Sequence, residues 1–261
     1  MADTVSWIDP AGAETVLTNQ AQVKHLKGQD NRYMPPVAYV EEEVPFQHGS
    51  RLREVRFRPR ETAQPILVEG TSPALVRAKL RSLLSALNPV RGDGRLKVVS
   101  HDGTARELVC RYSGGMEVEE RKGTKGRLWQ AAVPVFHASD PFWYDTAYTT
   151  ASLGVGTTAV NNTGDVDAWP EWTINGPFSS VTITNNTTGK AVALTVSVAS
   201  GETVTIDTRP GRKTVKRNDG TNLYPYLSAA SFLWPLIPGS NSVVIAGVAI
   251  TLNYKRRWLT I

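Results

Sequence analysis

The density of charged residues falls abruptly near residue 145. Residues 1–145 contain 38 Asp, Glu, Lys and Arg side chains, whereas residues 146–261 contain 15. Threonine changes in the opposite direction, from 7 to 19 residues. A segment that is rich in Thr and Val, poor in charge and punctuated by Gly and Asn is typical of half-buried strands joined by tight turns. We therefore expect two domains, 1–145 and 146–261, of which the second is entirely β.

The second part has the pattern of a series of short alternating strands. We predict strands over 172–175, 181–185, 191–198, 201–207, 213–217, 241–245 and 248–254. Turn residues separate them, as in Asn186-Thr-Thr-Gly189 and Asn218-Asp-Gly220. Seven or more short strands with turns at a spacing of roughly 8–12 residues indicate a β-sandwich.

One segment of the first part predicts a helix. Ser72 suits the N-cap and Pro73 the first helical position, while Asn88 before Pro89 ends the helical pattern. An apolar stripe at helical spacing lies between them, made of Leu75, Val76, Leu80, Leu83, Leu84 and Leu87. Such a stripe is usually a core face, so we expect this helix to bury all of it.

The rest of the first part has the pattern of strands. We predict strands over 37–44, 52–57, 65–69, 95–100, 105–112, 116–121 and 127–137, with a hairpin tip at 122–126. Asp102-Gly103 and Gly114-Gly115 supply the turn chemistry of hairpins. The fold class predicted for the chain is mainly β with minor α: a barrel-like N-terminal domain with one helix, followed by a β-sandwich.

No familiar catalytic or metal-binding motif occurs in the sequence. G-x-S-x-G, H-E-x-x-H, Walker A and G-x-G-x-x-G patterns are all missing. Cys110 is the single cysteine, and its apolar, alternating surroundings indicate a buried structural thiol. The four histidines, His25, His48, His101 and His137, lack the spacing of metal ligands. We expect no catalytic residue, no metal and no cofactor.

A glycoside hydrolase is one enzyme class to weigh, because it requires only a close pair of carboxylates. The candidates in the second part are Asp165, Asp167, Glu171, Glu202, Asp207 and Asp219. They lie at predicted turns or strand ends, and nothing in the sequence marks two of them as a pair. We therefore expect a protein that is not an enzyme.

Composition also limits where the chain acts. No run of 18 apolar residues exists, and the N-terminal residues lack the basic and apolar regions of a signal peptide. The expectation is a chain made in a cytoplasm, with no membrane insertion. The net charge of +5 is modest beside that of a dedicated nucleic-acid binder.

Two stretches resemble one protein family. Asp140-Pro-Phe-Trp-Tyr144 resembles the domain junction of siphovirus distal tail proteins, the baseplate-hub proteins often called Dit. The second stretch is similar to the C-terminal pattern of that family and runs through Trp169–Gly176, Val181–Gly189, Gly201–Asp207 and Pro238–Asn241. The order and spacing cover nearly the whole second part, while the first part agrees more loosely.

The resemblance implies a structural protein of the phage virion. Six copies would form a ring at the distal end of the tail tube, with the first domains making the ring and a galectin-like sandwich projecting outward. One side of this homohexamer would join the tail-tube protein and the other would carry a tail-associated lysin, tail fibre or receptor-binding protein. DNA would pass through the lumen without specific binding. The protein would lie at the tail tip after assembly in the host cytoplasm.

A ring requires two unlike, complementary surfaces on each subunit. An acidic run and a basic run are candidates for them, with the interface residues Glu41, Glu42, Glu43, Arg51, Arg53, Arg56 and Arg58. The alternative is that these runs are neighbouring, solvated strands of one subunit, and the sequence leaves both interpretations open.

The domain junction comprises Asp140, Pro141, Phe142, Trp143 and Tyr144. Proline stops strand pairing, so we expect the strand to end here and the aromatic residues to pack against the first domain.

The alternative function is a glycan- or receptor-binding sandwich, suggested by the seven tryptophans. Large aromatic residues are more often core residues, however, so we expect Trp169, Trp172 and Trp234 to be mostly internal.

Overall fold

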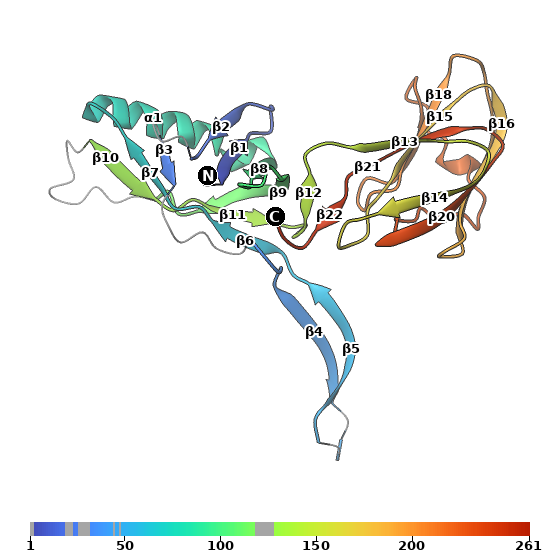
Figure 1. Ribbon diagram of the computed structural model, residues 1–261, viewed down its shortest axis with the longest axis horizontal. Helices are drawn as coiled ribbons and strands as arrows, with labels where there is room; N and C mark the ends of the chain where they lie inside the picture. Colours follow the sequence, from blue (N-terminus) through green and yellow to red (C-terminus); the bar gives the residue numbers. More distant parts are fainter. Residues whose placement is uncertain (1–2, 19–22, 26–31, 44, 47, 118–127) are drawn as a thin grey trace. The chain divides into compact units, whose positions relative to one another are not determined.

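The computed structural model describes residues 3–18, 23–25, 32–43, 45–46, 48–117 and 128–261. The chain divides into two compact units, one formed by Met1–Thr146 with Leu259–Ile261 and the other by Ala147–Trp258. We expected the second domain to extend to residue 261, but its last three residues lie in the first unit. Each unit is built mainly of antiparallel strands (Figure 1), so the predicted fold class is confirmed.

The first unit contains a large sheet and a small one. The large sheet has the order β2 (Glu14–Val16), β1 (Thr4–Ile8), β8 (Gly94–Val99), β9 (Ala105–Gly114), β11 (Val135–Ala138) and β6 (Arg60–Ala63), and β12 (Trp143–Asp145) also pairs with β9. The small sheet has the order β10 (Trp129–Ala132), β7 (Ile66–Glu69) and β3 (Val23–His25). The sequence did not predict β1, β2, β3 or β6, which have three to five residues each.

The segment predicted as one strand over 127–137 forms two strands in different sheets. Pro134 lies between β10 and β11, and proline has no N–H to donate to a ladder. Gly115 has a φ of 88°, and a Cβ there would lie 1.9 Å from the carbonyl oxygen of Val133, so only glycine fits. The strand and tip predicted over 116–126 fall mostly on residues 118–127, outside the described part of the chain.

The helix α1 (Pro73–Ala86) begins as predicted, with the Ser72 side chain accepting a hydrogen bond from the Leu75 N–H at 3.2 Å. Its buried face is narrower than the apolar stripe. Val76 and Leu83 are buried, whereas Leu75 and Leu84 are 39% and 47% exposed. At about 100° per residue, Leu75 and Leu84 lie on opposite flanks of the line through Val76 and Leu83. The expectation of a fully buried stripe was therefore wrong for these two leucines.

Trp7 joins the helix to the large sheet. Its ring stacks on Phe136 with the centroids 4.9 Å apart, and its Nε1–H donates to the carbonyl of Ala86 at 2.8 Å. A Cβ at Gly94 would lie 2.4 Å from the Trp7 ring, so the neighbouring strand can approach the indole only with glycine at this position. The short 3₁₀ turn η1 (Pro89–Arg91) follows the helix.

The second unit is a β-sandwich. One sheet has the order β13 (Thr149–Leu153), β21 (Ile250–Tyr254), β15 (Glu171–Asn175), β18 (Thr203–Asp207) and β19 (Thr214–Arg217). The other has the order β14 (Gly156–Asn162), β20 (Gly239–Ala246), β16 (Phe178–Asn185) and β17 (Lys190–Val198). The 3₁₀ turn η2 (Tyr224–Tyr226) precedes β20, and β22 (Arg257–Trp258) ends the unit. All seven strands predicted for this part are present, and the structure adds β13 and β14 before them.

The sandwich core contains a tryptophan pair and a buried amide network. Trp172 and Trp234 are fully buried with ring centroids 5.2 Å apart, and Trp169 is partly buried, so all three are mostly internal, as expected. The side chain of Asn185 donates to that of Asn241 at 3.1 Å, and Asn241 also donates to the carbonyls of Ile237 and Gly239. These amides satisfy backbone groups where the loops enter the core.

Candidate assembly surfaces

The acidic and basic runs of the sequence form one hairpin. Strands β4 (Val37–Glu43) and β5 (Ser50–Phe57) pair with each other and, among the described residues, with no other strand. Figure 1 shows them as a ribbon that leaves the strands of the first unit beyond β6. Every residue of β5 is exposed. We call residues 37–57 the arm.

One side of the arm, its apolar face, consists of Val37, Tyr39, Leu52, Val55 and Phe57. Val37 lies opposite Phe57 and Tyr39 opposite Val55. An irregularity after Val40 leaves Arg53 without an opposite residue, so that Leu52 lies opposite Glu41. Side chains alternate along a strand, and the irregularity shifts Leu52 by one position, so these five side chains project to the same side as Glu41. Tyr39 is 64%, Leu52 57% and Val55 49% exposed.

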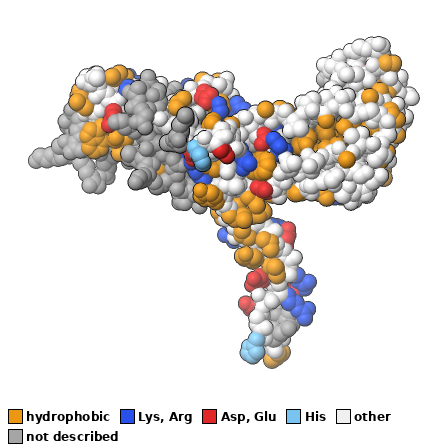
Figure 2. Space-filling model, viewed as in Figure 1, with side chains coloured by type: hydrophobic (Ala, Val, Ile, Leu, Met, Phe, Trp, Pro, Cys, Tyr) orange, Lys and Arg blue, Asp and Glu red, His pale blue; other side chains and the backbone are white. Residues whose placement is uncertain are grey.

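The predicted interface charges pair within the arm. Arg53 forms an ion pair with Glu42, and Arg56 forms one with Glu54. The hydroxyl of Ser50 donates to Glu41 at 2.6 Å. The pKa of Glu54 is lowered because its carboxylate accepts a hydrogen bond from Arg56. The two runs are thus neighbouring strands of one subunit, and any further contact of these charges with another copy stays a prediction. Figure 2 shows the charged side chains toward the tip of the arm and hydrophobic ones nearer β6.

The junction residues pack against the base of the arm and the core of the first unit. Trp143 is fully buried, as expected, and its Nε1–H donates to the carbonyl of Arg32 at 3.2 Å. The ring of Phe142 meets that of Phe57 edge-on, with the centroids 5.3 Å apart. The arm and the junction, far apart in sequence, therefore meet at Phe57 and Phe142.

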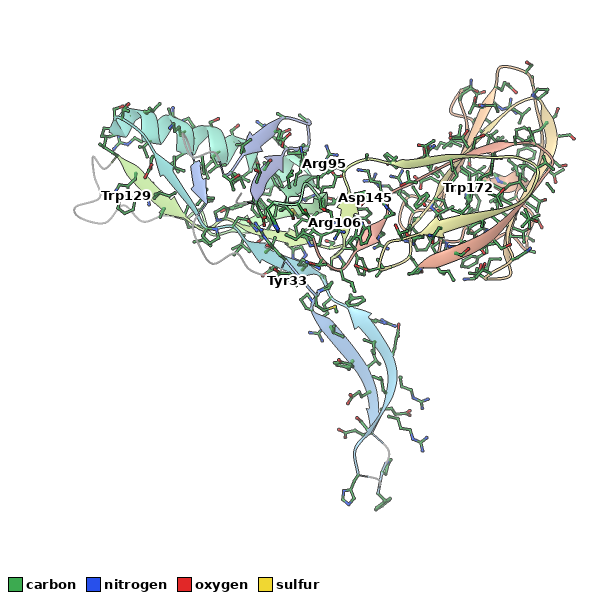
Figure 3. All side chains as sticks on the ribbon, viewed as in Figure 1. Tyr33, Arg95, Arg106, Trp129, Asp145 and Trp172 are labelled. Carbon is green, nitrogen blue, oxygen red and sulfur yellow. The ribbon has the colours of Figure 1, made fainter. Side chains whose placement is uncertain are left out.

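Two arginines hold the end of the chain in the first unit. Arg60 is fully buried, lies 5.9 Å from the centre of the Trp143 ring and donates to the carbonyl of Leu259 at 2.9 Å. Burial lowers the pKa of Arg60 to about 10. Arg106, labelled in Figure 3, donates to the carbonyl of Thr260. No sequence pattern predicts these contacts, because the partners are backbone carbonyls 199 and 154 residues away.

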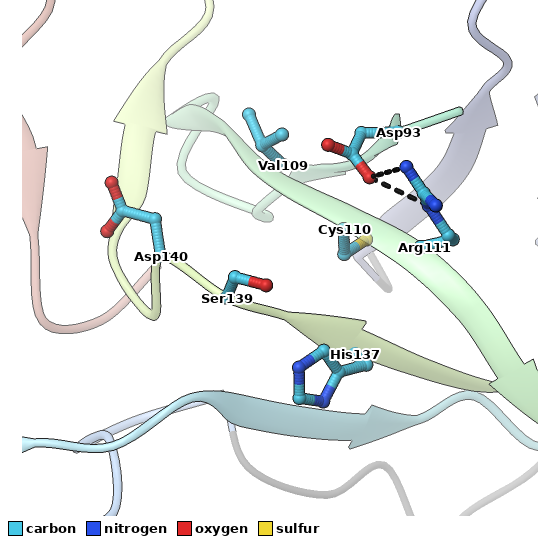
Figure 4. A pocket seen from close by; sticks show the side chains of 7 residues that line it. All are labelled: Asp93, Val109, Cys110, Arg111, His137, Ser139 and Asp140. Atoms are coloured by element: carbon cyan, nitrogen blue, oxygen red, sulfur yellow. Dashed lines mark hydrogen bonds and ion pairs between the residues drawn. The ribbon is translucent and has the colours of Figure 1, made fainter. Parts of the chain in front are cut away.

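A hollow of about 440 Å³ lies beside β9 and β11 (Figure 4). Two of its charged residues pair with each other, since Arg111 lies 2.8 Å from Asp93. Cys110 is buried, as predicted, and burial raises the pKa of its thiol far above the ordinary value of 9.0. A thiol that stays protonated at neutral pH is a poor nucleophile.

The structure brings two of the carboxylate candidates together. Glu171 lies directly opposite Asp207 on the neighbouring strand, a pairing that the sequence analysis missed. Arg209 lies between them, 2.5 Å from Asp207 and 3.5 Å from Glu171. Hydrogen bonds to Asp207 raise the pKa of Arg209. Arg209 thus bridges the two carboxylates as an ion pair that joins β15 to β18.

The described residues include no group of three or more His, Cys, Asp or Glu placed to hold a metal ion. Among the same residues, no helix has the length and hydropathy of a membrane span.

Comparisons with known proteins confirm the resemblance. Residues 163–258 match the family described as siphovirus-type tail component, C-terminal domain. The crystal structure of the Dit protein of phage SPP1, described as a paradigm of the hub adsorption apparatus in phages that infect Gram-positive bacteria, has a TM-score of 0.78 at 15% identity. The match covers 98% of this chain and 99% of that one.

A chain of the phage p2 baseplate in its activated conformation with Ca matches with a TM-score of 0.63 at 9% identity over the full length of both chains. The same baseplate with Sr gives 0.61 at 9% identity, again over both full lengths. No curated protein sequence matches. Residues 163–258 are therefore similar to a siphovirus-type tail component domain, and the whole chain has the Dit fold.

Proposed function

We propose that this chain is a distal tail protein, a structural phage protein whose copies form a ring between the tail tube and the host-adhesion apparatus. The observation that carries the proposal is the agreement of the whole chain, both units in order, with the Dit fold. The tail component domain at residues 163–258 supports it independently, from sequence.

In this proposal six copies close a ring through their first units, and the sandwiches project from it. One face of the ring joins the tail-tube protein, and the other carries a tail-associated lysin, fibre or receptor-binding protein. DNA passes through the lumen without specific binding. The protein catalyses no reaction, holds no cofactor and lies at the tail tip of the virion after assembly in the host cytoplasm.

The two sets of candidate residues have separate roles in the ring. The arm, with Glu41–Glu43 and Arg51–Arg58, forms part of the interface, and its charges fix the position of the contact rather than supply most of its energy, since exposed ion pairs contribute little. Residues Asp140–Tyr144 follow β11 and begin β12, and they fix the direction in which the chain leaves the first unit. Burial of Trp143 supports that role.

The mass of the assembled particle tests the proposal. We expect light scattering and electron microscopy of the purified full chain to show six-fold rings, alone or after addition of the tail-tube protein. A chain that stays monomeric at high concentration in both conditions would contradict the ring.

A second candidate function is binding of a host glycan or receptor by the sandwich. The aromatic residues Tyr224, Tyr226 and Phe232 are exposed on it, and Lys190 lies 4.3 Å from the centre of the Phe232 ring. Aromatic faces and polar tips of this kind suit recognition at a wet surface. Retention of residues 147–258 on host cell walls, lost in Tyr224→Ala/Tyr226→Ala, would favour this function, whereas no retention of the unchanged fragment would exclude it.

A further inference from the structure

We propose that one edge of the sandwich binds an acidic glycan, a sugar chain that carries carboxylate or phosphate groups, through Phe232, Lys190 and Lys213. This inference rests on the second candidate function, binding of a host glycan, and names the class of glycan and the residues that select it. It does not depend on whether the first units form a ring.

Residues 222–232, which we call the edge segment, connect the edge strands of the two sheets. β17 and β19 are the last strands of their sheets. The Leu223 N–H donates to the carbonyl of Val215 in β19 at 2.8 Å, and the Phe232 N–H donates to the carbonyl of Ala191 in β17 at 2.8 Å. Because both ends of the segment are bonded to a sheet, its side chains are held in place before any ligand binds.

The edge segment presents a set of exposed aromatic rings. Each is roughly half exposed, with 46% for Tyr224, 52% for Tyr226 and 47% for Phe232. Leu227 pairs with Leu194, three residues along β17 from the Ala191 that Phe232 contacts. Three residues of strand span about 10 Å, so the tyrosine end and Phe232 are spaced for more than one sugar. Exposed aromatic faces of this kind stack on the apolar faces of sugar rings.

Two lysines from different sheets meet at Phe232. The ammonium of Lys190, in β17, lies 4.3 Å from the centre of the Phe232 ring, and that of Lys213, just before β19, lies 5.7 Å from it. The two ammonium groups are therefore within about 10 Å of each other. The ring attracts each of them, but the like charges repel. An anion bound beside the ring removes this repulsion.

These lysines lack the counter-ions that other cations of the sandwich have. Arg209 and Arg217 lie 2.5 Å and 3.0 Å from carboxylate oxygens. Neither lysine ammonium forms an ion pair or a hydrogen bond with any residue that the structure describes, which includes the whole sandwich. The charge of Lys190 lowers the pKa of Asp167, while burial of Asp167, the larger effect, raises it. Asp167 thus acts on Lys190 only at longer range.

The charge of the sandwich favours a glycan over other anionic ligands. Residues 147–258 contain nine Lys and Arg and six Asp and Glu, an excess of only three positive charges. A nucleic acid needs Lys and Arg concentrated along one face, and anionic lipid is bound by clusters of about four to eight such residues. A small positive charge at one exposed ring fits a ligand in which anionic groups are spaced out by sugars.

The first experiment measures by calorimetry how the full chain binds three oligosaccharides of equal length. They are a galacturonic acid oligomer, a galactose oligomer that bears phosphate groups and a neutral galactose oligomer. We expect at least one acidic oligomer to bind roughly tenfold or more tightly than the neutral one, and the two acidic probes distinguish carboxylate from phosphate. For that oligomer, Lys190→Gln should raise the Kd about fivefold and Lys190→Gln/Lys213→Gln about tenfold or more.

Lys255→Gln is the matched control for the loss of one charge. Lys255 lies 5.2 Å from the centre of the Tyr148 ring and follows β21, toward the edge of the sheet opposite β19. We expect its Kd to be that of the unchanged chain. Equal losses in Lys190→Gln and Lys255→Gln would overturn the proposal, because net charge alone would then explain binding.

The second experiment separates the ring from the charges. Phe232→Leu removes the aromatic face but keeps an apolar side chain, whereas Phe232→Tyr keeps the face. We expect Phe232→Leu to raise the Kd about fivefold and Phe232→Tyr to leave it within about twofold of the unchanged chain. Equal urea midpoints show that the variants fold. Binding by Phe232→Leu as tight as that of the unchanged chain would contradict the proposal.

The outcomes separate this inference from the proposed functions. Equal affinity for acidic and neutral oligomers overturns the inference and leaves glycan binding standing. Binding of single-stranded DNA that weakens in Lys190→Gln/Lys213→Gln assigns the edge to nucleic acid, which also overturns it. No binding of either acidic oligomer overturns the inference alone, because retention on host cell walls decides the second candidate function and light scattering decides the ring.

Discussion

Strands β5 and β16 have the same length and both alternate, yet their environments are opposite. β5, SRLREVRF, is exposed at all eight positions, whereas β16, FSSVTITN, buries Val181, Ile183 and Asn185. β16 has a strand on each side and a second sheet facing it, while β5 has only β4 beside it. Alternation therefore fixes the side to which each residue points, and the topology around the strand decides whether either side is covered.

The largest change in the free energy of unfolding should come from truncating a buried tryptophan side chain in the core of the sandwich. Trp172→Ala should lower the free energy of unfolding by about 3–5 kcal/mol, the cost of deleting a buried large aromatic side chain. Its Nε1–H makes no hydrogen bond within the described chain, so Trp172→Phe should lose about 1.5 kcal/mol or less. Urea unfolding measures both, and a similar loss in the two variants would mean that packing is not what Trp172 contributes.

The second-largest loss of unfolding free energy should come from disrupting the buried amide network of the sandwich. Asn241→Ala leaves the Ile237 N–H, the Asn185 side-chain amide and three carbonyls without their partner, so we expect a loss of about 2–3 kcal/mol. Asn161→Ala is the control, because Asn161 is exposed and its side chain makes no hydrogen bond with the described residues, while its backbone carbonyl accepts one from Tyr254. A loss below about 0.5 kcal/mol in Asn241→Ala, the scale of surface changes, would remove the network from the stability of the sandwich.

The buried thiol of Cys110 should make the stability of the first unit depend on pH. Folding raises the pKa of Cys110 above its ordinary value of 9.0, so the unfolded chain loses this proton first as the pH rises. The thiol's contribution to stability is complete below pH 9 and should fall by about 1.4 kcal/mol by pH 10. The difference in unfolding free energy between the unchanged chain and Cys110→Ala measures it. A difference that does not vary between pH 8 and 10 would contradict it.

The arm should show the smallest effect on the monomer. Tyr39→Ser should change the unfolding free energy of the dilute protein by about 0.5 kcal/mol or less, because an exposed side chain has little burial to lose. A loss above about 1 kcal/mol at concentrations where no rings form would show that the apolar face is covered within its own subunit, and the contrast with β16 would fail.

Local chemistry made parts of the fold predictable. Ser72 with Pro73 marked the start of α1, and Asp102-Gly103 marked the turn between β8 and β9. The sandwich strands were predictable because alternating apolar residues and turn residues act within a few positions of each other. Short strands such as β2 and β3 have too few residues for any period to show.

Contacts between residues that are far apart in the sequence were not predictable. The sequence left open whether Glu42 and Arg53 meet in one subunit, and it gave no sign that Arg209 would join Glu171 to Asp207. Exposure of Leu75 and Leu84 depends on how much of α1 the sheet covers, which the helical period alone does not determine.

The return of the chain to the first unit determines what a protease or a label would reveal. The sandwich lies between Thr146 and Leu259, and the residues on both sides of it belong to the first unit. A single cut near residue 147 therefore leaves the sandwich covalently attached through Trp258 and Leu259, and a free sandwich fragment appears only after a second cut. A fluorophore at Ile261, next to the carbonyls that Arg60 and Arg106 hold, would likewise report on the environment of the first unit, although the sandwich precedes it in the sequence.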